Sequence, residues 1–226
     1  MLSAAWLGPA FTVVVLCTLA ASLYAVARID EPRGAWGQAL RSRLLLGVPW
    51  GTLVTVLVVL GSYLLVQDGF AQWRNPVTIP FRAWSWFYPT GIGFASFTHV
   101  GPGHLTGNLI GTLLFGSVAE YAYGHFPTKR GSQSFTSLAT NPFVRAFAFV
   151  PAAAVVGGVA LAAFGLGPVI GFSGVVFALA GFALVRYPMT TIVFALGGQS
   201  VASVLYSALR NPIVTTEVSQ SAPSPP

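Results

Sequence analysis

Residues 169–181 read VIGFSGVVFALAG, and this run decides what kind of helix the chain builds. It is apolar throughout except for Ser173, which lies in the tetrad GFSG between Gly171 and Gly174. Small residues in an apolar helix let two helices approach closely, and for an isolated Gly-x-Ser-Gly this packing role is the commoner one. The alternative is a nucleophilic serine. The polar residues that lie level with Ser173 decide between the two.

The composition of the chain is that of an integral membrane protein. Of its 226 residues, 54% are hydrophobic and 7% are charged, and the mean hydropathy is +0.73. Charge-free stretches that can cross about 30 Å of hydrocarbon predict transmembrane helices, because an open sheet would leave backbone groups unpaired in lipid. We therefore expect an all-α, polytopic bundle in the lipid bilayer, with no nucleic-acid partner. The six predicted spans are 4–27, 44–66, 104–124, 146–166, 168–185 and 190–209.

These spans divide the chain into three regions. Residues 1–43 hold an N-terminal transmembrane helix and a basic loop, residues 44–209 form the membrane domain, and residues 210–226 form a Pro/Ser-rich tail. The first span is predicted to be retained, because it is longer than a signal-peptide core and no basic residue precedes it. Cys17 is the one cysteine, so no internal disulfide is expected.

Basic residues alternate between the predicted loops and set the orientation of the chain. Cytoplasmic loops are enriched in Lys and Arg. The N-terminus, the tail and the aromatic-rich loop 67–100 are therefore predicted to lie outside the cell membrane, and the loop is expected to lie in the membrane interface. The eight inner basic residues are Arg28, Arg33, Arg41, Arg43, Lys129, Arg130, Arg145 and Arg186, and the three outer ones are Arg74, Arg82 and Arg210.

Several polar residues lie level with Ser173 in this topology. The third span enters from outside at FTHVGPGHLTGNLIG, residues 97–111, which places His99 at the surface, His104 at the first turn and Asn108 one turn deeper. The fifth span also enters from outside, and Ser173 lies roughly 7 to 8 Å further in. Singly, Asn108 reads as a hydrogen-bonding residue between helices and His104 as an interfacial side chain. Together with Ser173 they supply a nucleophile and oxyanion donors.

The remaining polar residues do not favour metal-dependent, paired-aspartate or soluble-hydrolase chemistry. Glu120 lies inside a span, and we expect it to accept a structural hydrogen bond from a loop. The sequence has no His-Glu-x-x-His motif, and three histidines with a distant cysteine do not make a zinc set, so no metal and no cofactor are expected. A paired-aspartate mechanism needs two buried acids, but the two aspartates of the sequence, Asp30 and Asp68, lie in predicted loops. Val175 stands where the Gly-x-Ser-x-Gly elbow of soluble hydrolases needs glycine.

Over residues 44–209 the sequence resembles the rhomboid family of intramembrane serine proteases. The resemblance lies in HVGPGHLTGN at 99–108, in Glu120, and in GFSG at 171–174. It implies an enzyme, a serine-type endopeptidase (a hydrolase), whose partners are transmembrane protein substrates that it cleaves within their transmembrane segments.

The same resemblance implies roles for individual residues. Ser173 would be the nucleophile, and His104, Asn108 and the Ser173 backbone amide would form the oxyanion hole, with His99 beside them. Gly171 and Gly174 would permit close helix approach.

The sequence also departs from the family's pattern. The pair Trp73-Arg74 lies 25 residues before His99, whereas many members carry a Trp-Arg pair closer to the histidines, and Phe177 stands where many have a tyrosine. The family's general base is a histidine on a further span, and the chain ends at SAPSPP before such a span. We therefore expect a truncated chain that lacks its base and cleaves poorly. A pseudoprotease that binds membrane-protein helices is the main alternative. A small transporter or channel is a remote one, because no span carries a chain of charges.

Overall fold

The chain folds into a helical bundle, seen in a computed structural model that describes residues 13, 14, 16, 17, 20, 21, 23, 24, 26–28, 35–127, 131–165 and 168–198. Within these residues there is no strand, and one isolated antiparallel bridge joins Ala83 to Val169. The all-α prediction is therefore confirmed. The tail 210–226, most of the first span and the end of the sixth lie outside the described residues.

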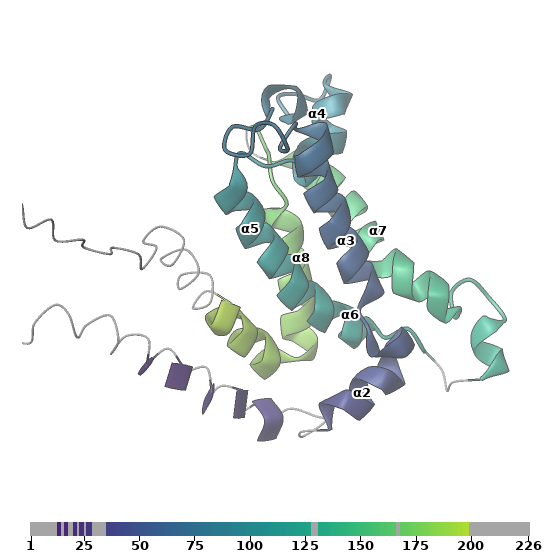
Figure 1. Ribbon diagram of the computed structural model, residues 1–226. Helices are drawn as coiled ribbons and strands as arrows, with labels where there is room; N and C mark the ends of the chain where they lie inside the picture. The colour runs from purple at the N-terminus through teal and green to yellow at the C-terminus, as the bar shows by residue number, and fades with distance from the viewer. Residues whose placement is uncertain are drawn as a thin grey trace, which may run out of the picture.

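Figure 1 labels the helices α2 to α8, and the described residues hold a further helix after α8 and helical residues within 13–28. Helix α3 continues through a π-helical turn, η3 (Ser62–Val66). A second π-helical turn, η6 (Thr112–Gly116), joins α5 (Pro102–Gly111) to α6 (Ser117–Tyr123) without a break. The short 3₁₀ turns are η2 at Leu45–Gly47, η4 at Ile79–Phe81, η5 at Ala95–Phe97 and η7 at Ser132–Phe135. The helices are α2 (Trp36–Arg43), α3 (Trp50–Gly61), α4 (Pro89–Phe94), α5 (Pro102–Gly111), α6 (Ser117–Tyr123), α7 (Pro142–Phe164), α8 (Ser173–Arg186) and the final helix (Pro188–Gly198).

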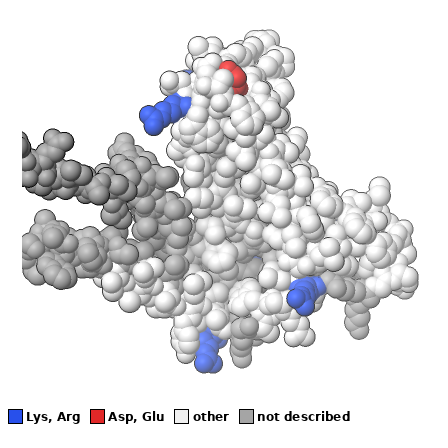
Figure 2. All heavy atoms as spheres, in the orientation of Figure 1, with Lys and Arg blue, Asp and Glu red and all other residues white. Residues whose placement is uncertain are grey.

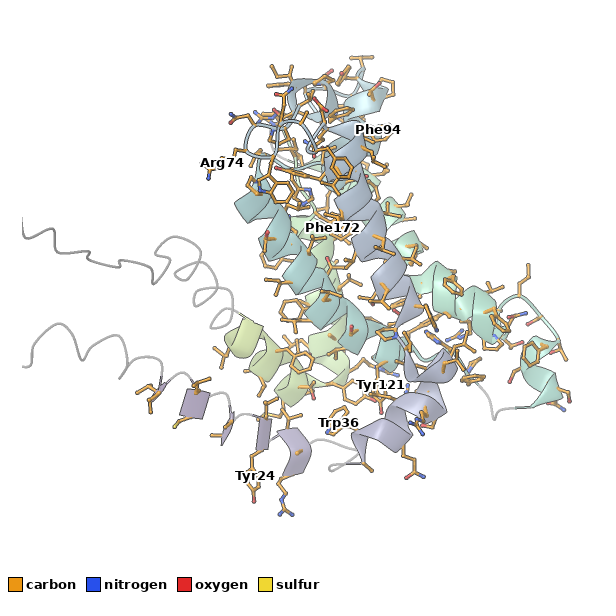
Figure 3. All side chains as sticks on the ribbon, in the orientation of Figure 1. Tyr24, Trp36, Arg74, Phe94, Tyr121 and Phe172 are labelled. Carbon is orange, nitrogen blue, oxygen red and sulfur yellow. The ribbon has the colours of Figure 1, made fainter. Side chains whose placement is uncertain are left out.

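The long helices lie side by side, and the bundle has two distinct ends. Figure 1 shows α3, α5 with α6, α7 and α8 packed together, with α4 and its loops at one end and α2 at the other. We call these the α4 end and the α2 end. Figure 3 places Arg74 and Phe94 at the α4 end, Trp36 and Tyr121 at the α2 end, and Phe172 inside the bundle between them.

Glycines let the helices approach one another closely. A Cβ atom at Gly51 of α3 would lie 2.7 Å from the Ala146 carbonyl oxygen of α7, and one at Gly111 would lie 2.7 Å from Val176 Cγ1 of α8. Such close backbone approach is the usual means of packing helices in an apolar setting. It brings α8 into the centre of the core. The buried apolar residues of that core are Val59, Tyr63, Leu105, Val118, Ala119, Val150, Ala154, Phe172, Val175, Val176, Leu179 and Ala183.

Helix lengths give only part of the predicted membrane topology. Among the described residues, α7 alone is long and apolar enough to cross a membrane by itself, with 23 residues. The predicted second span starts later than expected, at Trp50, because residues 45–47 form a turn in which Leu46 has φ 57°. The fifth starts at Ser173, because Gly171 at φ 115° and the bridge at Val169 keep the preceding residues out of the helix. The six spans are thus not supported by helix length alone.

Candidate functional site

Ser173 is the first residue of α8, and its position follows from the turn before it. Gly171 donates its N–H to the Ala95 carbonyl at 2.8 Å, and Phe172 is fully buried. This anchors the tetrad and leaves the Ser173 side chain half-buried at the helix N-terminus. Among the described residues Ser173 Oγ has no hydrogen-bond partner. Its hydroxyl is therefore available to a ligand.

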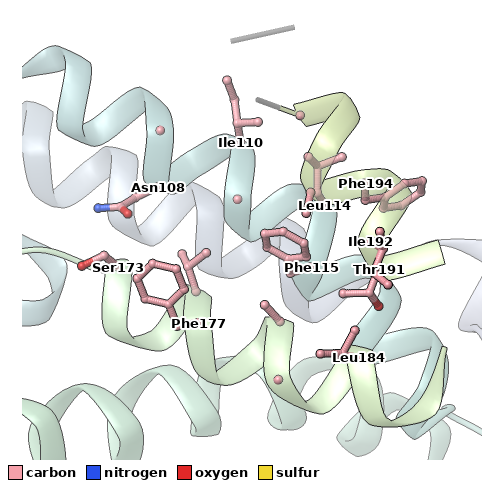
Figure 4. A pocket seen from close by; sticks show the side chains of 17 residues that line it. Asn108, Ile110, Leu114, Phe115, Ser173, Phe177, Leu184, Thr191, Ile192 and Phe194 are labelled. Atoms are coloured by element: carbon pink, nitrogen blue, oxygen red, sulfur yellow. The ribbon is translucent and has the colours of Figure 1, made fainter. Parts of the chain in front are cut away.

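A cavity of about 570 Å³ opens beside Ser173. It lies between α5 with η6 on one side and α8 on the other, and the final helix closes its far end, as Figure 4 shows. Asn108 and Ser173 lie at the same end of this cavity, on facing helices. The rest of the wall is mainly apolar and includes Ile110, Leu114, Phe115, Val176, Phe177 and Leu184. The site thus has a polar end and a long apolar groove, in which Phe177 is 74% exposed.

His104 lies against the backbone just before Ser173. A Cβ atom at residue 171 would stand 2.3 Å from His104 Cε1 and 2.8 Å from Nε2, and the residue has φ 115°. Only glycine meets both conditions, because side chains rarely adopt that φ and no space is left for one. Gly174 plays a different part, since a Cβ there would lie 2.4 Å from Leu161 Cδ1 of α7. The two glycines therefore fit α8 to His104 on one side and to α7 on the other.

His99 reaches the site through Asn108. Asn108 Nδ2 lies 2.9 Å from His99 Nε2, and the rings of His99 and His104 are 5.1 Å apart in a T-shaped arrangement. The amide nitrogen can only donate, so His99 Nε2 accepts and His99 carries its proton on Nδ1. The Nδ1 of His104 is buried and has no hydrogen-bond partner within the described residues. Sequence reasoning placed His99 at the surface, but the structure buries it completely.

The burial of His99 predicts a loss of stability in mild acid. Burial, and then the neighbouring His104, lower the pKa of His99 from 6.5 to about 4. The unfolded chain therefore takes up this proton first as the pH falls, so stability that is present above pH 6.5 is lost toward pH 4. At about 1.4 kcal/mol per pKa unit the loss is about 3 kcal/mol.

Thermal unfolding in detergent at pH 7 and pH 4.5, for the wild type and for His99→Gln, measures this effect. The variant should lose less stability than the wild type over this interval. Equal losses in the two proteins would contradict the assignment to His99.

Glu120 and His125 lie away from Ser173, at the α2 end. Glu120 is fully buried and accepts hydrogen bonds from the N–H groups of Gly51 and Thr52, at 3.0 and 2.7 Å, and from the Thr52 hydroxyl. Its fourth donor is His125 Nε2 at 2.9 Å, because His125 Nδ1 accepts the Leu45 N–H. Glu120 therefore caps the first turn of α3, and it also accepts a hydrogen bond from His125 in the loop after α6, as expected from the sequence. His125 is part of this network and does not reach the cavity.

Two arginines, which served in the sequence only to predict orientation, hold the end of α6. Arg43 donates to the carbonyls of Tyr121 and Ala122, at 2.9 Å each, and Arg145 donates to the carbonyl of Tyr123 at 3.2 Å. The last carbonyls of a helix have no intrahelical donor and attract cations. Gln67, the first residue of the predicted outer loop, is fully buried and bonds to the backbone of His99. The sequence signal for it is a glutamine directly after the apolar run SYLLV.

In the described part of the chain no three His, Cys, Asp or Glu side chains come together as a metal-binding group. The fold and the cavity define a helical bundle with a serine hydroxyl, an amide and two imidazoles at one end. Comparison of the chain with protein-family models, with curated proteins and with solved structures gives no match.

Proposed function

We propose that the chain is a rhomboid-like intramembrane serine endopeptidase that cleaves transmembrane segments. The observation that carries the proposal is the polar end of the cavity. There Ser173 and Asn108 line one space, and His104 lies against the turn that leads to Ser173. The GFSG tetrad and Glu120 are also among the residues that carry the sequence resemblance to the rhomboid family.

A multi-pass membrane location is part of the proposal. Figure 2 shows charged side chains at the two ends of the bundle, and the middle of that face carries none. Large apolar side chains are exposed along the flanks, including Leu57 at 66%, Val156 at 69% and Val185 at 83%. Exposed apolar surface of this extent suits lipid better than water. We infer that α3, α5 with α6, α7 and α8 are spans, and that the first and last predicted spans complete a set of six.

The proposed chemistry is acyl transfer to Ser173. Its hydroxyl would attack a peptide carbonyl, and the developing oxyanion would accept hydrogen bonds from Asn108 Nδ2 and from the Ser173 N–H at the start of α8. The peptide C–N bond would then break, the amine would leave with the serine proton, and water would release the acyl group from Ser173. Backbone N–H groups at a helix N-terminus favour negative charge. His104 would add a donor from the side of Gly171. The apolar groove next to this end would hold an apolar segment of the substrate.

One observation favours a second candidate function. The structure describes all three histidines of the sequence, and none of them is hydrogen-bonded to Ser173. A serine without a base is a weak nucleophile. The alternative is therefore a pseudoprotease that binds transmembrane helices in the same groove and does not cut them.

Co-reconstitution with a single-span reporter protein tests both candidates. A photo-reactive amino acid in place of Leu184, inside the groove, should capture the reporter, and one in place of Leu57, exposed on α3 outside the groove, should not. Reporter cleavage that disappears in Ser173→Ala supports the endopeptidase. Capture without cleavage supports the helix-binding protein. No capture at residue 184 and no cleavage would overturn both.

The predicted orientation gives a separate result. A cysteine at Ser132, in η7, should react with a membrane-impermeant maleimide only from the inside, and one at Gln72 only from the outside. Both positions are exposed, and the basic residues follow the positive-inside rule only in this orientation. Labelling of intact and opened cells, in a variant with Cys17→Ser as background, measures it. The reverse pattern would contradict the proposed depth of Ser173.

A further inference from the structure

Gln67 is a fully buried polar side chain that the proposed chemistry does not use. It follows the π-helical turn η3 directly and begins the loop that leads to α4. A buried amide is stable only when its donors and acceptors are satisfied. The partners of Gln67 therefore show what it is there to hold.

Those partners are backbone groups of two other residues, Val77 in the same loop and His99 further along the chain. Gln67 Oε1 accepts the His99 N–H at 2.7 Å, and Gln67 Nε2 donates to the His99 carbonyl at 2.8 Å. Nε2 also donates to the Val77 carbonyl at 2.8 Å, and the Val77 N–H donates back to the Gln67 carbonyl at 2.8 Å. One side chain thus pairs with both backbone groups of His99, much as a neighbouring strand would.

The side chain of His99 carries this constraint to the cavity. His99 Nε2 accepts one hydrogen of the Asn108 amide, and the described residues offer that amide no second partner. The remaining hydrogen of Asn108 Nδ2 is then the one left for a ligand beside Ser173. The position of His99 therefore sets the direction in which Asn108 donates.

We propose that Gln67 is a positioning residue of the Ser173 site. It fixes the backbone of His99, whose ring orients the Asn108 amide toward the oxyanion of the substrate. This inference rests on the proposed endopeptidase function. It adds to that function a residue that touches neither the substrate nor the serine.

The first test follows the imidazole of His99 and needs no catalysis. In ¹⁵N NMR spectra of the purified protein in detergent, the wild type should show His99 as a single Nδ1–H tautomer with Nε2 hydrogen-bonded. Gln67→Leu should mix the tautomers, whereas Gln72→Leu, at an exposed glutamine bonded only to Asp68, should not. If Gln67→Leu does not fold, Gln67→Glu takes its place, because it keeps the acceptor for the His99 N–H. Mixed tautomers in the wild type, or no change in a folded Gln67 variant, overturn the proposal.

The second test is a double-mutant cycle on reporter cleavage, in a version of the chain that carries an added histidine-bearing helix. Gln67→Leu should lower kcat on the order of 10²-fold and leave KM within about twofold, since a misplaced donor acts in the transition state. Combined with Asn108→Ala it should add little, because both changes remove the same donor. Additive losses would overturn the positioning role. Absence of Ser173-dependent cleavage in the parent would overturn the proposed function instead, and the NMR result would still decide whether Gln67 orients His99.

Discussion

Replacing Glu120 by glutamine should lower the free energy of unfolding by about 3 to 5 kcal/mol, the largest stability loss that we expect from a single carboxylate in the described residues. All four groups around the Glu120 carboxylate are donors. An amide in its place would turn two N–H groups toward some of those donors and leave them unpaired in a buried site. His125 cannot relieve the conflict, because its Nδ1 is already the acceptor of the Leu45 N–H.

The matched control is Asp68→Asn at the α4 end. It makes the same change from carboxylate to amide, but Asp68 is exposed and its carboxylate accepts one hydrogen bond, from the Gln72 side chain at 3.2 Å. Asparagine also tolerates the φ of 58° at this position. We expect a change within about 0.5 kcal/mol. Denaturant unfolding in mixed micelles compares the two, and similar stability losses for both variants would show that the Glu120 network contributes little.

The all-α class, and the helical positions of His104, Asn108 and Ser173, could be predicted from the sequence for reasons that are local. An apolar run without charges forms a helix in any packed apolar environment, and residues three or four apart share a face. That reasoning placed His104 and Asn108 on α5 and Ser173 on α8, and the structure brings these helices together at one cavity.

The partners of the buried polar residues could not be predicted in the same way. Gln67 bonds to a residue 32 positions away and Glu120 to residues 68 and 69 positions away. No periodicity relates such positions, because the contacts depend on how the helices pack. The start of α8 was missed for a similar reason, since a long-range hydrogen bond from Gly171 to Ala95 fixes the turn before it. A polar residue at the edge of an apolar run indicates a candidate buried polar group, but its position in the sequence does not predict its hydrogen-bond partner.

The largest effect on activity should come from supplying a base to Ser173. Among the three histidines, His125 is committed to Glu120 at the far end of the bundle, and His99 accepts from Asn108. His104 lies against Gly171, on the side from which the oxyanion would be bound. A residue that removes the Ser173 proton must accept it, whereas an oxyanion residue must donate, so His104 cannot do both in one step.

We therefore compare the cleavage rate of the 226-residue chain with that of a version to which a histidine-bearing helix is joined beside α8. The chain alone should cleave a transmembrane reporter more slowly, by a factor on the order of 10⁴ or more. Loss of one member of a nucleophile and base pair has an effect of this size. The cavity leaves room for such a partner, since Phe177 and Leu184 on its α8 wall are exposed.

The measurement compares initial rates for three proteins: the chain alone, the chain joined to that helix, and the chain joined to the same helix with alanine in place of histidine. Cleavage by the joined chain should depend on Ser173 and on the added histidine, and the alanine version should match the chain alone. Rapid Ser173-dependent cleavage by the chain alone would contradict this expectation and assign the base to His104, in which case His104→Ala, but not His125→Ala, should abolish the activity.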